Sequence, residues 1–140
     1  MNIVDRRPVH VYILVVVNVA KAQENGLEGN CYLFSTHGFH GADLPITTVR
    51  KGNKIVWRVM PIDADSSVRI TSFGGPAVPG MVKPAPIGGT EHTMWSSLVT
   101  QAGHDVPYEV ALTFDGDPRE HSYTCRLTTD EPRSEGSAIG

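Results

Sequence analysis

The sequence predicts an all-β protein, an antiparallel β-sandwich of about seven or eight strands with an Ig/cupredoxin-like or jelly-roll-like arrangement. Apolar and polar residues alternate with a period of two in several short segments. Gly, Asn and Asp residues, which favour tight turns, separate these segments. The sequence has almost no helical apolar periodicity. This combination is typical of sheets that bury one face against a core.

The first apolar segment, residues 9–17, is rich in Val and Ile and predicts a central strand. Both of its faces are apolar and need cover, which favours a homo-oligomer. Two arginines precede it and a small-residue pattern follows at 20–22, so a secretory signal over residues 1–22 is the alternative. His10 and Tyr12 interrupt the apolar run, which favours the strand. The segment is too short for a transmembrane helix, and we expect no membrane partner.

Four later segments alternate most clearly and predict strands with one buried face. Their apolar positions are Ile55, Trp57 and Val59; Val68 and Ile70; Tyr108, Val110, Leu112 and Phe114; and Tyr123, Cys125 and Leu127. Weaker alternation predicts strands over residues 31–35, 44–49 and 93–99. Turn-forming residues occupy positions 51–53 and 115–118. Since Trp57 alternates with buried positions, we expect it in the core.

Residues 74–89 interrupt this pattern, because the four prolines and five glycines among them exclude a regular strand or helix. A loop of this length is usually functional or mobile. Residues 130–140 are polar and predict a flexible C-terminal tail. The chain length predicts a single domain, over residues 1–129.

Charge and cysteine content limit the partners and the compartment. The net charge of −3 and the lack of a basic run argue against a nucleic-acid partner. Cys31 and Cys125 fit two buried thiols, as in a cytoplasmic protein, or a disulfide in a secreted one. We expect a cytoplasmic protein, with secretion as the alternative if residues 1–22 are a signal.

Catalytic motifs are absent from the sequence, which lacks G-x-S-x-G, a P-loop, H-E-x-x-H and paired C-x-x-C. We expect no enzyme activity, no catalytic residues and no cofactor. A blue-copper site is excluded because neither His nor Met follows Cys125. His37 and His40, with Asp43, have a spacing that could hold zinc or copper. Incidental loop histidines explain them better, and we predict no metal site.

Two acidic pairs, Asp63 with Asp65 and Asp115 with Asp117, lie in predicted turns. If the pairs meet in space they could bind calcium as in lectins; separately they are ordinary turn-formers. Trp95 follows the Pro/Gly-rich residues, and we expect it to be exposed. Trp95, Asp63 and Asp65 are therefore the predicted ligand-binding residues, for a carbohydrate or another small ligand.

An ordered set of motifs is shared with a known family. The motifs are ADL at 42–44, KIVWR at 54–58, IDADSSVRITSF at 62–73, a Pro-rich segment, MWS at 94–96, and Gly103 followed by Tyr108. In order and spacing they resemble the PixA/AidA inclusion-body protein family over residues 9–128. The Pro-rich segment is shorter than in that family, and HSYTC at 121–125 replaces its aromatic-rich ending.

The resemblance implies a small bacterial protein that self-associates, and it carries over no catalytic residues. Some members of the family accumulate as cytoplasmic inclusions, and some are linked to cell-density-regulated expression and to host interaction. The function expected from the resemblance is a non-enzymatic inclusion-body-type protein. The alternative is a β-sandwich module that binds a carbohydrate or another ligand, with or without calcium.

Overall fold

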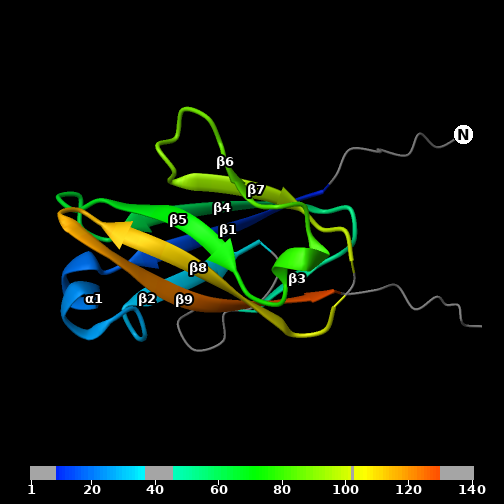
Figure 1. Cartoon of the computed structure of the whole chain (residues 1–140), viewed down its shortest axis with the longest axis horizontal. Coiled ribbons are helices and arrows are strands. Elements are labelled where there is room, and N and C mark those ends of the chain that lie inside the picture. The colour runs from blue at the N-terminus through cyan, green and yellow to red at the C-terminus, as the bar shows by residue number, and fades with distance from the viewer. Residues whose placement is uncertain (1–8, 37–45, 102, 130–140) are drawn as a thin grey trace, which may run out of the picture.

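Two β-sheets pack face to face in the computed structural model, which describes residues 9–36, 46–101 and 103–129 (Figure 1). The elements in chain order are β1 His10–Val17, α1 Val19–Asn25, β2 Cys31–Ser35, β3 Ile46–Val49, β4 Lys54–Pro61, β5 Val68–Gly74, η1 Val78–Gly80, β6 Ala85–Pro86, β7 Met94–Leu98, β8 Val106–Phe114 and β9 Asp117–Thr129. One sheet has the order β2-β1-β4-β7-β6 and the other β3-β9-β8-β5. The prediction of a layered, predominantly β fold is confirmed.

Two strand pairs run in the same direction, which the predicted antiparallel sandwich does not include. β1 pairs with β4 in parallel and β3 pairs with β9 in parallel, whereas the other ladders are antiparallel. Between β1 and β4 the chain passes through α1, β2 and β3, which supplies the long crossover that a parallel pair requires. Alternation in a sequence reports the buried face of a strand. It does not report the direction of the neighbouring strand.

β1 lies between β2 and β4, which confirms the predicted strand over residues 9–17. The short helix α1 that follows is absent from the prediction. Asn18 caps its start by accepting a hydrogen bond from the Lys21 amide at 3.3 Å, and Gly26 ends it with a φ of 88°. These caps are visible in the sequence, but a helix of 7 residues is too short to show an apolar period. No described helix is long and apolar enough to cross a membrane.

The core lies between the sheets and contains the alternating positions that the sequence singles out. Its largest fully buried side chains include Trp57, Tyr108, Ile13, Leu33, Ile55, Ile70 and Leu112. The burial of Trp57 is as predicted. The predicted strands over residues 31–35 and 93–99 correspond to β2 and β7, and β3 is the described part of the one over residues 44–49.

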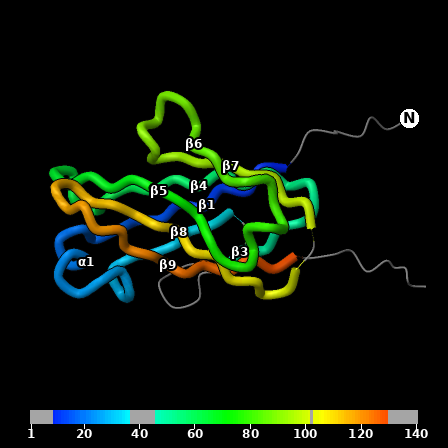
Figure 2. Tube along the Cα trace, viewed as in Figure 1, coloured from blue at the N-terminus to red at the C-terminus, as the bar shows by residue number. Residues whose placement is uncertain are grey.

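The Pro/Gly segment, residues 74–89, is more regular than predicted. It contains η1 and the two-residue strand β6, which pairs with β7 (Figure 2). Gly75 brings it close to β8: its φ is 98°, and a Cβ atom there would lie 3.0 Å from the Tyr108 Cα. The Ala77 amide then donates to the Pro107 carbonyl at 3.0 Å. These contacts with β7 and β8 order a segment whose composition alone predicts an irregular loop.

Candidate functional site

The outward surface of the five-stranded sheet carries an apolar patch, which we call the outer apolar face. Its residues are Tyr12, Leu14 and Val16 of β1, Tyr32 and Phe34 of β2, Val56, Arg58 and Met60 of β4, and Met94 of β7. The alternate residues of β1 are buried between the sheets, so these side chains point away from the core. Tyr12 is 49% exposed, Phe34 is 45% exposed, and Tyr32 and Met60 are each 37% exposed. Several large apolar side chains therefore meet solvent together.

Strand register arranges the outer apolar face in rows across the sheet. The middle row consists of Phe34, Leu14, Arg58 and Met94 on neighbouring strands. A shallow hollow of about 490 Å³ lies over this row. Its described lining carries one charged side chain, that of Arg58. The face thus combines projecting aromatic rings with a recess.

Four aromatic side chains from both sheets meet beneath this face, namely Trp57, Phe73, Trp95 and Tyr108. Ring centroids lie 4.5 Å apart for Trp57 and Phe73, and 5.3 Å apart for Phe73 and Trp95. The Trp57 Nε1 donates a hydrogen bond to the Tyr108 Oη at 3.0 Å. Burial raises the pKa of the Tyr108 hydroxyl well above its ordinary value. Ring packing and a satisfied buried hydrogen bond indicate a structural role for this cluster.

Cys31 and Cys125 are both free and both buried, in agreement with the buried-thiol interpretation. Burial raises the pKa of Cys125 to about 12, although a hydrogen bond from the Tyr108 hydroxyl acts in the opposite direction. Burial and the nearby Cys125 raise the pKa of Cys31 as well. Since the thiolate is the reactive form, protonated buried thiols are poor nucleophiles.

The prediction that Trp95 is exposed is wrong. Trp95 is 8% exposed because β7 places it opposite Trp57 on β4, where its ring packs against Phe73. Its Nε1 donates to the His92 carbonyl at 3.2 Å. The remaining surface lines a groove of about 610 Å³, the side groove, between β5 and the Pro/Gly segment; its other residues include Phe73, Pro79, Met81, Lys83 and Pro84. Trp95 therefore offers little ring surface for stacking on a sugar.

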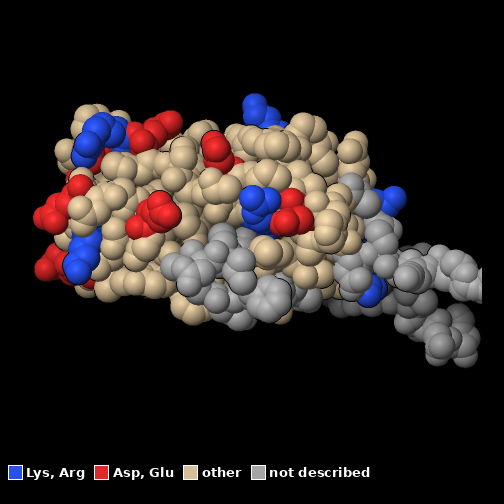
Figure 3. Space-filling view, turned by 90° about the horizontal axis from the view of Figure 1, so that it is seen from below, with Lys and Arg blue, Asp and Glu red and all other residues tan. Residues whose placement is uncertain are grey.

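Asp63 and Asp65 lie in the turn between β4 and β5, at an end of the sandwich where charged side chains gather (Figure 3). The Asp63 carboxylate accepts a hydrogen bond from the Asp65 amide at 3.0 Å, the local contact of an Asx turn. Neither residue lines the side groove beside Trp95. The side groove therefore does not bring Trp95 together with Asp63 or Asp65. Carbohydrate binding through them stays a prediction, which a glycan array with and without calcium would check.

The second acidic pair, Asp115 and Asp117, flanks the turn between β8 and β9 at the same end. The Ser67 hydroxyl donates to the Asp115 carboxylate and joins the two turns. The Arg119 Nε and Nη2 atoms donate to the Asp117 carboxylate, both at 2.9 Å. These bonds hold the pKa of Asp117 well below its usual range. Each carboxylate of this pair therefore has a protein partner.

Potential metal ligands are scattered in the described structure. The predicted alternative at His37, His40 and Asp43 lies outside the described residues, as does the predicted tail over residues 130–140. Within residues 9–36, 46–101 and 103–129, no group of three or more His, Cys, Asp or Glu side chains could hold a metal ion.

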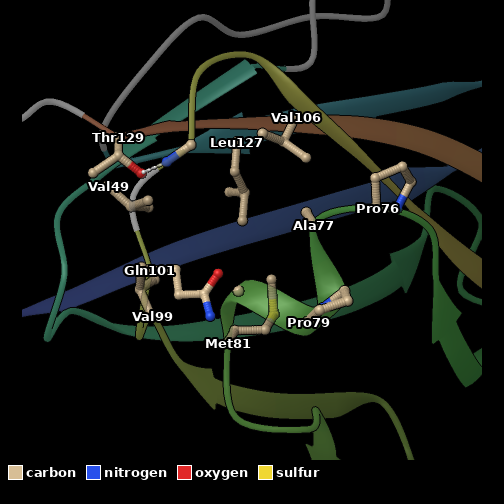
Figure 4. A pocket seen from close by; sticks show the side chains of 12 residues that line it. Val49, Pro76, Ala77, Pro79, Met81, Val99, Gln101, Val106, Leu127 and Thr129 are labelled. Carbon is tan, nitrogen blue, oxygen red and sulfur yellow. Dashed lines mark hydrogen bonds between the residues drawn. The ribbon is translucent and has the colours of Figure 1, made fainter.

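The elements that line a further hollow, the end cavity, lie at the end of the sandwich opposite the acidic turns (Figure 1). Figure 4 shows the side chains that line it. Its volume is about 110 Å³. Its described lining consists of Val49, Pro76, Ala77, Pro79, Gly80, Met81, Val99, Gln101, Gly103, Val106, Leu127 and Thr129. The Pro/Gly segment forms one wall, and β3, β8 and β9 contribute to the other.

The sequence predicts only part of the outer apolar face. Both faces of residues 9–17 are apolar, and this segment supplies Tyr12 and Leu14. Tyr32 and Phe34 were not predicted, although the sequence Cys31–Ser35 is also apolar on both faces. No pattern in the sequence predicts the end cavity, because its lining residues come from distant parts of the chain.

The chain matches one family model and shares its fold with a solved structure. The model of a family described as Domain of unknown function (DUF8788) matches residues 9–120. The chain is similar to the crystal structure of the inclusion body protein PixA from Burkholderia cenocepacia J2315, with a TM-score of 0.70 and 8% identity. That match covers 93% of this chain and 100% of the other. Curated proteins give no match. The resemblance to PixA/AidA proteins is therefore confirmed as a shared fold.

Proposed function

The chain belongs to the family described as Domain of unknown function (DUF8788), and we propose that it is a non-enzymatic protein that self-associates through its outer apolar face. The observation that carries the proposal is the joint exposure of Tyr12, Tyr32, Phe34 and Met60 on one surface of the sheet. Contiguous exposed apolar patches on soluble proteins mark interaction surfaces. Association would remove this patch from water.

A second copy of the chain suits this surface in shape and composition. The face carries aromatic rings and methionines with a single arginine, and its nine residues include no Lys, Asp or Glu. This composition is typical of the centre of a protein interface. A two-fold axis through the face would set projecting rings such as Tyr12 against the recess over Arg58 of the other copy. Such self-complementary contacts are the usual basis of symmetric dimers.

The fold comparison supports the same proposal. The similar protein from Burkholderia cenocepacia is called an inclusion body protein, and an inclusion of folded molecules requires contacts between copies. The high pKa of the Cys125 thiol, raised by burial, supports the non-enzymatic part, because it disfavours thiol nucleophilic chemistry. The proposed location is the cytoplasm. Density-regulated expression and host interaction stay predictions from the resemblance.

Sedimentation velocity over a wide range of protein concentrations tests the proposal. We expect the weight-average sedimentation coefficient to rise with concentration. Because apolar contacts drive the proposed association, sodium sulfate should strengthen it. Association driven by surface charge would weaken as salt rises. A strict monomer up to the solubility limit would contradict self-association.

A further inference from the structure

The end cavity is separate from the surface on which the proposed function depends, since none of its lining residues belongs to the outer apolar face. Its walls are mainly aliphatic. Leu127 and Met81 reach into it from opposite sides, and the apolar lining also includes Ala77 and Val106 (Figure 4). An apolar molecule of matching size would contact these side chains and remove their apolar surface from water.

Backbone hydrogen bonds hold the walls of the end cavity in place. The Gly80 amide donates to the Ala77 carbonyl, and the Gly80 carbonyl accepts from the backbone amide of Gln101, both at 3.0 Å. On the other side the Thr129 amide donates to the Gly103 carbonyl at 2.7 Å, and the Gly103 amide donates to the Thr129 Oγ1 at 3.0 Å. A cavity that exists before a ligand arrives requires little ordering on binding, which favours affinity.

The volume of the end cavity and the lack of charge on its described lining residues limit which ligand it can bind. An engineered apolar cavity of about 150 Å³ binds benzene, so the end cavity, at about 110 Å³, fits an apolar body of about four or five non-hydrogen atoms. None of its described lining residues is charged, so an ionic ligand would lose hydration without gaining a partner. The side-chain amide of Gln101 lies at the border of the cavity, where it can form a hydrogen bond with one polar group of a ligand (Figure 4).

We propose that the end cavity binds a small neutral molecule with an apolar body and one hydroxyl or carbonyl group. The body would lie between Leu127 and Met81, and the polar group would face Gln101. This binding site is independent of self-association. The chemical class that we assign is that of short-chain alcohols and ketones.

The test uses the full chain labelled at the methionine methyl groups and titrated with 1-pentanol. Met81 reports on the end cavity, whereas Met60 and Met94 report on the outer apolar face. We expect a saturable shift of the Met81 methyl signal with Met60 and Met94 unchanged. Because Met81 also borders the side groove, the indole N–H signal of Trp95 serves as a reporter for that groove and should not move.

Two variants localise the site. Ala77→Leu adds volume to the wall and should abolish the saturable shift, whereas Ala85→Leu, on exposed β6 outside the cavity, should leave it unchanged. Val106→Ala enlarges the cavity at a partly exposed position that is easier to alter. It should tighten binding of 1-hexanol about fourfold relative to the unaltered chain, as expected for one more buried methylene. This second variant keeps the test valid if Ala77→Leu does not fold.

Other outcomes would overturn the assignment. No saturable shift at Met81 up to the solubility of pentanol means no binding, whatever the oligomeric state. Equal binding of pentanoate would contradict the neutral class. Parallel shifts at Met60 and Met94, or at the Trp95 indole, would place the alcohol on the outer apolar face or in the side groove instead.

Discussion

The two sheets share one core, yet their outward faces differ in chemistry. The five-stranded sheet turns Tyr12, Leu14, Phe34, Val56 and Met60 away from the core. The four-stranded sheet turns Arg69, Glu109, Glu120, Ser122 and Thr124 away from the core. These polar residues make the outward face of the four-stranded sheet suited to contact with water. Apolar residues on both sides of β1, β2 and β4 instead call for a third layer, which a second copy of the chain can supply.

The largest expected effect comes from placing charge on the apolar face. Tyr12→Lys combined with Phe34→Lys should weaken self-association about 100-fold or more, because each substitution removes an aromatic contact and buries an ammonium group. Sedimentation velocity measures the dissociation constant. The matched control is Ser122→Lys combined with Thr124→Lys on the exposed surface of β9. Equal weakening by both pairs would show that net charge, and not the outer apolar face, governs association.

The second prediction compares a tyrosine of the shared core with one of the outer face. Tyr108→Phe removes the acceptor of the Trp57 indole hydrogen and should lower the free energy of unfolding by about 1–3 kcal/mol. Tyr12→Phe removes a hydroxyl from a half-exposed ring and should change it by less than about 0.5 kcal/mol. Urea denaturation at concentrations where the chain is monomeric measures both. Similar losses for the two variants would contradict the structural role of the buried bond.

The predicted part of the fold is the part that local chemistry determines. The alternation of Tyr108, Val110 and Leu112 with polar neighbours assigns a buried face within one strand, and β8 has that face buried. The burial of Trp95 depends instead on Trp57 of another strand and Phe73 of the other sheet. A sequence read in order does not reveal such contacts.

The same distinction applies to the candidate sites. The apolar character of β1 is readable in the chain, so one strand of the outer apolar face was predictable. Its rows across four strands depend on the register of β1 with β2 and β4 and of β4 with β7. The end cavity requires Val49, Ala77 and Leu127 to converge from three distant segments. Convergence of this kind follows from topology, which alternation does not specify.

A third prediction concerns the one charge on the apolar face. Arg58 lies between Leu14 and Met94 in the middle row, where association would bury its guanidinium group. Arg58→Leu should therefore tighten self-association about tenfold. Arg69→Leu, on the outward face of the four-stranded sheet, should leave the dissociation constant unchanged. Weaker association of Arg58→Leu would mean that Arg58 pairs with an acidic group of the second copy.

The smallest expected effect lies at the polar sheet, in the turn that Asp117 and Arg119 close. Arg119 holds the pKa of Asp117 below its unfolded value of about 3.9. The bond therefore stabilises the fold above about pH 4, and that stability is lost as the pH falls toward the lower folded pKa. Asp117→Asn should lower the Tm by about one or two degrees at neutral pH, and its difference from the unaltered chain should shrink below about pH 4. Arg119→Gln should weaken the same pH dependence without removing it, because the backbone amide of residue 119 and the His121 side chain still contact the Asp117 carboxylate. A constant difference between Asp117→Asn and the unaltered chain from neutral pH to pH 2 would show that the charge on Asp117 does not contribute.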